Sequence, residues 1–237
     1  MCSVQQPQFT ILHEPGDKDS DICGRDVLTC RLIALLIFSI LSVSSAAPAQ
    51  DVVGSITEIE GVAHLQRAGH TFNAALTMRI QMHDKLLTMH DAHLAITLRG
   101  GNQLALAASS AIVIAFQRND THEHVEIDLL AGHLTSIVRS GAFPGITVRT
   151  PNAVAAVNGG EFETAYIAGK SCPDSPPCLS YTDVGVFEGI VQVSNPTNPQ
   201  NPSVQVKPGL ETAVPCELPP TSPAPFGMRE LGMPQYH

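Results

Sequence analysis

Histidines are the residues of this sequence that could most readily carry chemistry, since eight of the ten lie in the middle of the chain. His90 and His93 are three positions apart, and His122 and His124 are two apart. Residues two apart on a strand share a face, so His122 and His124 could ligate one metal ion together. However, His124 alternates with the apolar Val125, which is typical of a solvated strand face. We therefore expect no metal site, and His-dependent metal binding is kept only as an alternative function.

Two carboxylate pairs, Glu58/Glu60 and Glu161/Glu163, have the i, i+2 spacing that puts both side chains on one face of a strand. Such a pair could do acid–base work inside a cleft. Acidic strand faces exposed to solvent are far commoner, and the net charge of −9 supplies many of them. The sequence has no G-x-S-x-G, H-E-x-x-H or P-loop motif. We predict no catalytic residue, no cofactor and no enzymatic activity.

A double glycine, Gly159-Gly160, raises the question of a ligand-binding loop. A phosphate-binding glycine loop follows a strand and opens a helix. Here a strand pattern follows, and it brings Glu161 and Glu163 next to the site where an anion would bind. Phosphate binding is therefore excluded. Asn158-Gly159 is instead a strong β-hairpin signal, so we expect a tight hairpin with a structural role.

Cys172 and Cys178 enclose a polar, proline-rich segment. In an exported protein this spacing predicts a short loop closed by a disulfide. Zinc is the alternative, but a structural zinc site needs four ligands and no histidine is near in sequence. This predicted pairing leaves Cys216 without a disulfide partner.

The composition excludes two classes of partner. Charged residues make up 15% of the 237 residues, and lysines and arginines form no cluster. Nucleic-acid binding depends on clustered positive charge, so we expect no nucleic-acid partner and no docking on an anionic membrane surface.

The beginning of the chain reads as a leader. Arg31 precedes an apolar run at residues 32–41, and small residues follow up to Ala49. This is the plan of a secretory signal peptide over residues 1–49, cleaved after Ala49. The run is too short for a transmembrane helix, and a buried helix is the other reading. Residues 1–26 are acidic where a signal peptide should be basic, so whether they are translated stays open. We expect a periplasmic or secreted protein without a membrane span after processing.

Period-two alternation runs through the rest of the chain, for example at Leu94, Ile96 and Leu98. Short strands recur about every 8–12 residues between glycines or polar turns, which predicts an all-β fold, either β-solenoid-like or a twisted sandwich of many short strands. The phrases "GSITEIEGVAHL", "AGHLTSIV" and "EGIVQVS" each place a glycine before an apolar run. The stretch 72–81 fits neither a strand nor a helix pattern clearly. We assign residues 50–214 to the β domain and 215–237 to a proline-rich flexible tail.

The stretch "VRTPNAVAAVNGGEFETAY" resembles the most characteristic segment of the FecR-type domain, T-P-x-A-x-A-x-V-R-G-T-x-F. Asn158 stands where that pattern has Arg, and Gly160 where it has Thr. The matching residues are Thr150, Pro151, Ala153, Ala155, Val157, Gly159 and Phe162. We expect a structural motif that consists of Thr150, Pro151, Asn158, Gly159, Gly160 and Phe162. The sequence identifies no binding residue.

Other phrases extend the resemblance over about residues 53–214. "HDKLLT" and the turn "RGGN" are similar to the family's G-D-x-I-x-T and D-G-S phrases, and "FEGIVQVSN…VQVKPGLETAV" to its ending. The resemblance implies an extracytoplasmic β domain. The cytoplasmic anti-sigma segment of the best-known members has no counterpart here, so we expect a stand-alone domain that binds an envelope protein or a cell-wall component. Regulation of the transmembrane anti-sigma, iron-uptake type is the alternative.

Overall fold

The computed structural model describes residues 52–119, 122–140, 145–172, 175, 177–198 and 200–227. The chain divides into two units, Met1–Ala49 and Gln50–His237. The predicted leader and its cleavage site lie outside the described residues, as do residues 228–237. In the described part, no helix is long and apolar enough to cross a membrane.

The described residues of the second unit form 17 β-strands and no helix, which confirms the all-β prediction. Alternation decides which side chains are buried: in the strand His93–Leu98 every second residue is buried, beginning with Leu94. The regular coils of a solenoid stay a prediction. The strands are β1 (Val52–Glu60), β2 (Ala63–Arg67), β3 (His70–Asn73), β4 (Arg79–Gln81), β5 (Lys85–Thr88), β6 (His93–Leu98), β7 (Gln103–Leu106), β8 (Ala111–Asn119), β9 (His122–Val138), β10 (Ile146–Arg149), β11 (Val154–Val157), β12 (Gly160–Ala168), β13 (Ser180–Gly189), β14 (Val191–Ser194), β15 (Val204–Val206), β16 (Leu210–Pro215) and β17 (Ala224–Pro225).

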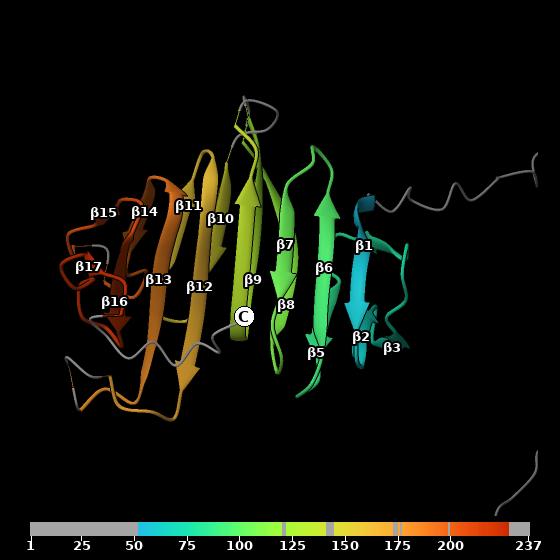
Figure 1. The fold of residues 1–237 in the computed structure, drawn as a ribbon, viewed down its shortest axis with the longest axis horizontal. Coiled ribbons are helices and arrows are strands. Elements are labelled where there is room, and N and C mark those ends of the chain that lie inside the picture. Colours follow the sequence, from blue (N-terminus) through green and yellow to red (C-terminus); the bar gives the residue numbers. More distant parts are fainter. Residues whose placement is uncertain are drawn as a thin grey trace, which may run out of the picture. The chain divides into compact units, whose positions relative to one another are not determined.

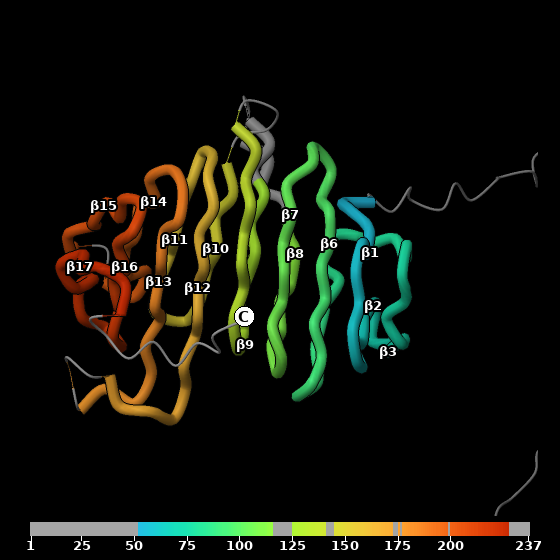
Figure 2. The backbone as a smooth tube through the Cα atoms, viewed as in Figure 1, coloured from blue at the N-terminus to red at the C-terminus, as the bar shows by residue number. Residues whose placement is uncertain are grey.

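The strand pairings define two layers. Layer A has the order β4-β1-β6-β7-β9-β12-β13-β16-β17, and layer B has the order β3-β2-β5-β8-β9-β10-β11-β14-β15. Figure 1 shows β6, β7, β9, β12 and β13 of layer A side by side, with β5, β8, β10 and β11 of layer B behind them. The chain passes repeatedly from one layer to the other, as the backbone tube in Figure 2 shows.

The core lies between the layers and consists mainly of aliphatic side chains. Phe162 of the predicted motif is fully buried in it. Each large apolar side chain buried in this way contributes about 1.5–3 kcal/mol. The largest fully buried side chains are Phe162, Ile56, Leu65, Ile80, Leu86, Leu94, Ile96, Leu104, Leu106, Ile112, Ile114 and Ile127.

Strand β9 belongs to both layers and changes from one to the other at Gly132. Residues up to Ala131 pair with β8 in layer B, and residues from Gly132 onward pair with β12 in layer A. Gly132 has φ 81°, and a Cβ there would lie 2.7 Å from Ser110 Cα. Ser110 Oγ accepts a hydrogen bond from the backbone N–H of His133 at 2.9 Å. The corner therefore requires glycine both for its φ and for the close approach.

The predicted hairpin at Asn158-Gly159 is wrong. β11 lies in layer B between β10 and β14, and β12 lies in layer A between β9 and β13. Because both edges of β11 are already paired, the chain passes to the other layer instead of folding back. Gly160 has φ 128°, and a Cβ there would lie 2.1 Å from the carbonyl oxygen of Glu188. The stretch is thus a corner between layers that packs against the next corner, at Gly189.

The disulfide joins Cys178 to Cys216, with 5.8 Å between the Cα atoms, and this corrects the predicted Cys172–Cys178 pairing. The reason is a long-range strand pairing. β13 and β16 are antiparallel neighbours with Tyr181 opposite Pro215, so the residues just outside that pair come together. Cys172 is buried beside Cys178 and Tyr181 in a small separate cluster.

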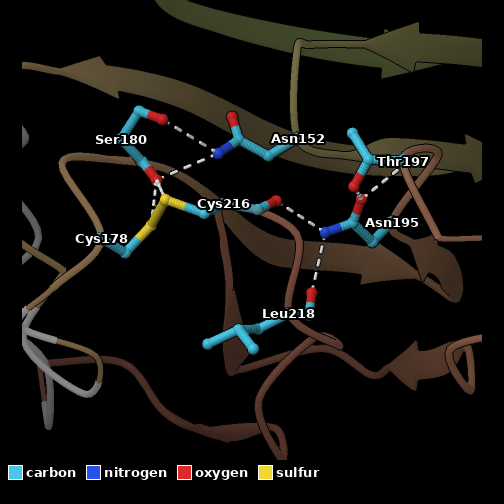
Figure 3. Close-up of a disulfide and its surroundings, with 7 residues drawn as sticks. All are labelled: Asn152, Cys178, Ser180, Asn195, Thr197, Cys216 and Leu218. Atoms are coloured by element: carbon cyan, nitrogen blue, oxygen red, sulfur yellow. Dashed lines mark hydrogen bonds between the residues drawn. A yellow bond between two sulfur atoms is a disulfide. The ribbon is translucent and has the colours of Figure 1, made fainter.

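The proline-rich segment after Pro215 is attached to the domain as far as residue 227, which corrects the predicted flexible tail for these residues. The side-chain amide of Asn195 donates hydrogen bonds to the carbonyls of Cys216 and Leu218, each at 2.8 Å (Figure 3). The backbone N–H of Thr221 donates to Ala213 at 2.8 Å. Strand β17 then pairs with β16.

Gly132→Ala should lower the free energy of unfolding by at least about 2 kcal/mol, because the new Cβ meets Ser110 and the backbone is left-handed. Gly69→Ala is the matched control: Gly69 has φ 80°, but nothing lies within 4 Å of its Cβ position. It should cost about 1 kcal/mol. Urea denaturation measures both. Equal losses would contradict the close approach at Gly132.

Cys216→Ser should lower the free energy of unfolding by about 4 kcal/mol, because the disulfide closes a loop with a sequence separation of 38. Disulfide mapping by mass spectrometry should recover a linked peptide that contains Cys178 and Cys216. Cys172→Ser is the control and should keep that peptide. A linked peptide containing Cys172 and Cys178 would contradict the pairing.

Candidate functional site

The outer face of layer A carries the carboxylates that the sequence singled out. The strand register aligns five residues in one row across the layer: Glu58 is opposite Ala95, followed by Ala105, Thr135 and Glu163. Side chains next to these along β6, β7 and β9 point into the core, so this row faces outward. The side chains in the middle of the row are therefore short, and the carboxylates at its two ends carry negative charge.

This arrangement forms a groove of about 460 Å³, which we call the acidic groove. Its floor is made of small side chains, and carboxylates stand on both sides of it. The lining residues are Glu60, His93, Ala105, Ala107, Thr135, Glu161, Glu163 and Phe187. The two carboxylate pairs, about a hundred positions apart in the sequence, thus lie on opposite sides of one surface feature.

Glu163 is held in an environment that disfavours its charge. Burial raises the pKa of this carboxyl above its ordinary value of 4.5. None of the ion pairs found among the described residues involves a carboxylate of the groove: they join Arg67 to Asp84, Arg149 to Glu126, and His90 to Asp91. The groove therefore holds negative charge that the described part of the chain does not neutralise.

His133 lies on the same face, one row from the groove, opposite Ala165 of β12. Burial lowers the pKa of this imidazole, and the nearby positive charge of Lys170 lowers it further. Its Nδ1 atom is buried without a hydrogen-bond partner among the described residues. The neutral imidazole is therefore the form that this face stabilises.

An aromatic pair borders the groove. Phe187 of β13 is 50% exposed and stacks on Phe226, with 5.2 Å between the ring centroids. Phe226 lies over Gly185, where a Cβ would be 2.7 Å from the Phe226 ring. No local pattern in the sequence indicates this contact, because Phe226 reaches the sheet only through the attached segment after Pro215.

The histidines were the candidate metal ligands in the sequence. No group of three or more His, Cys, Asp or Glu side chains that could hold a metal ion occurs within the described ranges. His93 lines the groove, whereas His90 lies on an exposed turn with its Nε2 atom 2.8 Å from Asp91. His122 and His124 belong to β9, where their backbones pair with β8, and their side chains lie outside the described part.

The first residues of the predicted structural motif form a buried turn away from the groove. Thr150 Oγ1 accepts a hydrogen bond from the N–H of Ala153 at 2.9 Å and lies 2.7 Å from Thr182 Oγ1. The neighbouring Asn152 donates from its side-chain amide to the carbonyl of Ser180 at 3.0 Å, close to the disulfide (Figure 3). Pro151 is exposed on this turn. These bonds tie layer B to the start of β13 in layer A.

Comparison with known proteins gives a family match. Residues 84–192 match the family model described as FecR protein. This range is narrower than residues 53–214, over which the sequence motifs suggested the resemblance. No curated protein matches the chain. Two crystal structures of a "putative anti-sigma factor" from Parabacteroides distasonis are similar, with 20% and 19% identity and TM-scores of 0.46. Each match covers 60% of this chain, which spans 59% of the length of those structures.

Glu163→Gln should raise the free energy of unfolding at pH 7 by up to about 1 kcal/mol, because the amide removes a charge that burial disfavours. The folded-state pKa is raised, so the stability that protonated Glu163 provides is complete below pH 4.5 and is lost as the pH rises through the folded-state pKa. Urea denaturation from pH 4 to 8 should show this slope reduced in the variant. The exposed Glu58→Gln is the control, and an equal effect there would contradict the role of burial.

Proposed function

We propose that this chain, whose residues 84–192 form a FecR-type domain, is an exported, non-catalytic binding domain that contacts another protein of the cell envelope. The leader-like residues 1–49 support export. The Cys178–Cys216 disulfide supports it as well, because disulfides persist in oxidising compartments.

The observation that carries the proposal is the half-buried, unneutralised Glu163 in a groove with carboxylates on both sides. Stability alone does not favour such a residue, since its charged form is disfavoured in the folded protein. Titratable groups held in unfavourable environments inside a groove are typical of functional sites. A ligand that neutralises these carboxylates would recover the lost interaction energy. The groove is therefore the surface on which we place the partner.

The partner segment that fits this groove is extended and positively charged. Lysine and arginine side chains form charge-assisted hydrogen bonds with carboxylates, and these are stronger in a partly desolvated groove than in water. The low floor at Ala105 and Ala107 leaves room for a polypeptide backbone to cross the strands. The exposed face of Phe187 can stack against a guanidinium group. The net charge of −9 would also attract a basic partner from a distance.

A photo-crosslinking residue in place of Ala107 tests this proposal in intact cells. It should capture one partner, and the crosslink should map to a segment of that partner that carries lysine or arginine. Lys207 is exposed and lies outside the groove, so the same residue placed there is the control. Combined Glu60→Gln and Glu163→Gln substitutions should reduce the Ala107 crosslink at least tenfold, because they remove two charges from the groove. An undiminished crosslink would contradict the proposal.

The family match also favours a second candidate, a regulator in signalling of the anti-sigma type, since a FecR-type domain supports a signalling-related role. In that case the groove would receive a signalling protein. Co-purification with a sigma factor, or a cytoplasmic fraction that holds the chain with residues 1–49 intact, would favour this candidate over the exported domain.

A further inference from the structure

A second groove, on the outer face of layer B, has a different chemistry. It has a volume of about 540 Å³, within the roughly 300–1,000 Å³ of small-molecule sites. We call it the amide groove. No charged side chain is among the described residues that line it. The lining residues are Ser140, Ala156, Val157, Asn158, Gly159, Ile190, Gln192 and Gln205.

The strand register explains why amides gather there. Gln192 of β14 is opposite Gln205 of β15 on one side and opposite Ala156 of β11 on the other. The three side chains therefore share the outer face of layer B, with the small Ala156 as floor between the amides and the exposed Asn158. At Gly159 a Cβ would lie 2.1 Å from Ser140 Oγ, so the absence of a side chain there brings the serine close.

The charged residue in the same row of strand positions, Glu126, is held in an ion pair. The row continues from Ala156 to Thr147 of β10 and Glu126 of β9. Glu126 forms an ion pair with Arg149, with 3.0 Å between Oε1 and Nε, so these two charges neutralise each other. The described lining residues thus present amides and a hydroxyl and carry no charge. One N–H of the Gln192 amide is donated to Ser203 Oγ, which leaves its other N–H and its carbonyl oxygen for a ligand.

We infer that the amide groove binds an uncharged saccharide. An amide side chain offers both a donor and an acceptor, and this matches sugar hydroxyls, which do both. Ile190 is 53% exposed at the border and can cover the C–H face of a sugar ring. The described lining residues would supply no counter-ion to a charged ligand. This inference goes beyond the proposed contact with a protein and does not depend on it, because the acidic groove lies on the other layer.

A glycan array that carries neutral and acidic oligosaccharides tests the inference with the purified protein. Binding should be confined to neutral glycans. Titration calorimetry with the best neutral glycan of the array should then show at least a tenfold loss of affinity in the double variant Q192A/Q205A. Both glutamines are exposed, so this variant should keep the melting temperature of the parent protein.

The double variant E161Q/E163Q is the matched control, because it changes two polar residues of the acidic groove and leaves the amide groove intact. It should bind the neutral glycan with unchanged affinity. Three results would overturn the inference: no saturable binding of a neutral glycan, a preference for sulfated or carboxylated glycans, or undiminished binding by Q192A/Q205A. If the otherwise unaltered protein with the crosslinker at Ala107 captures no partner in cells while its neutral-glycan binding is retained, only the proposed contact with a protein is overturned.

Discussion

Backbone packed directly against backbone at the corners is the constraint on which the two layers depend. At Gly132, β9 leaves one layer for the other with Ser110 so close that a Cβ has no space. At Gly160 and Gly189 two successive corners touch, each with its absent Cβ aimed at the other's carbonyl. A chain that changes layers repeatedly must stack its corners, and glycine is the residue that allows the closest stacking. This constraint accounts for the glycines that precede apolar runs in the sequence.

The same corners set the chemistry of both outer faces. Because β9 crosses at Gly132, its second half places Thr135 in the middle of layer A, between Ala105 and Glu163. The corner at Gly160 sends β12 into layer A with its carboxylates outward, while β11 stays in layer B with Ala156 outward. One segment thus supplies a wall of the acidic groove and the floor of the amide groove.

Sequence alone predicted what is local and missed what depends on distant pairing. Period-two alternation predicted the strands, and the alternating residues Leu94, Ile96 and Leu98 form the buried face of theirs, because a strand's two faces are fixed by its own residues. Asn158-Gly159 is a hairpin signal only if the flanking strands are free to pair, and β11 is already paired on both edges. The partner of Cys178 follows from the pairing of β13 with β16, which no spacing reveals. The carboxylate pairs were found, but not that they face one another.

The folded domain can tolerate the unfavourable free energy of a charged carboxylate at Glu163. A stable core between two fully paired layers tolerates the loss of up to about 1 kcal/mol at one position, since single substitutions commonly cost as much. Removing that cost would be an easy gain in stability, and proteins often give up such gains where binding needs an unfavourable charge. The floor of the acidic groove is formed by central strands of layer A that are paired on both edges, so the carboxylates on its two sides are held apart without a ligand. The partner that we propose would meet a preformed charged surface and would not need to order it, which lowers the entropic cost of association.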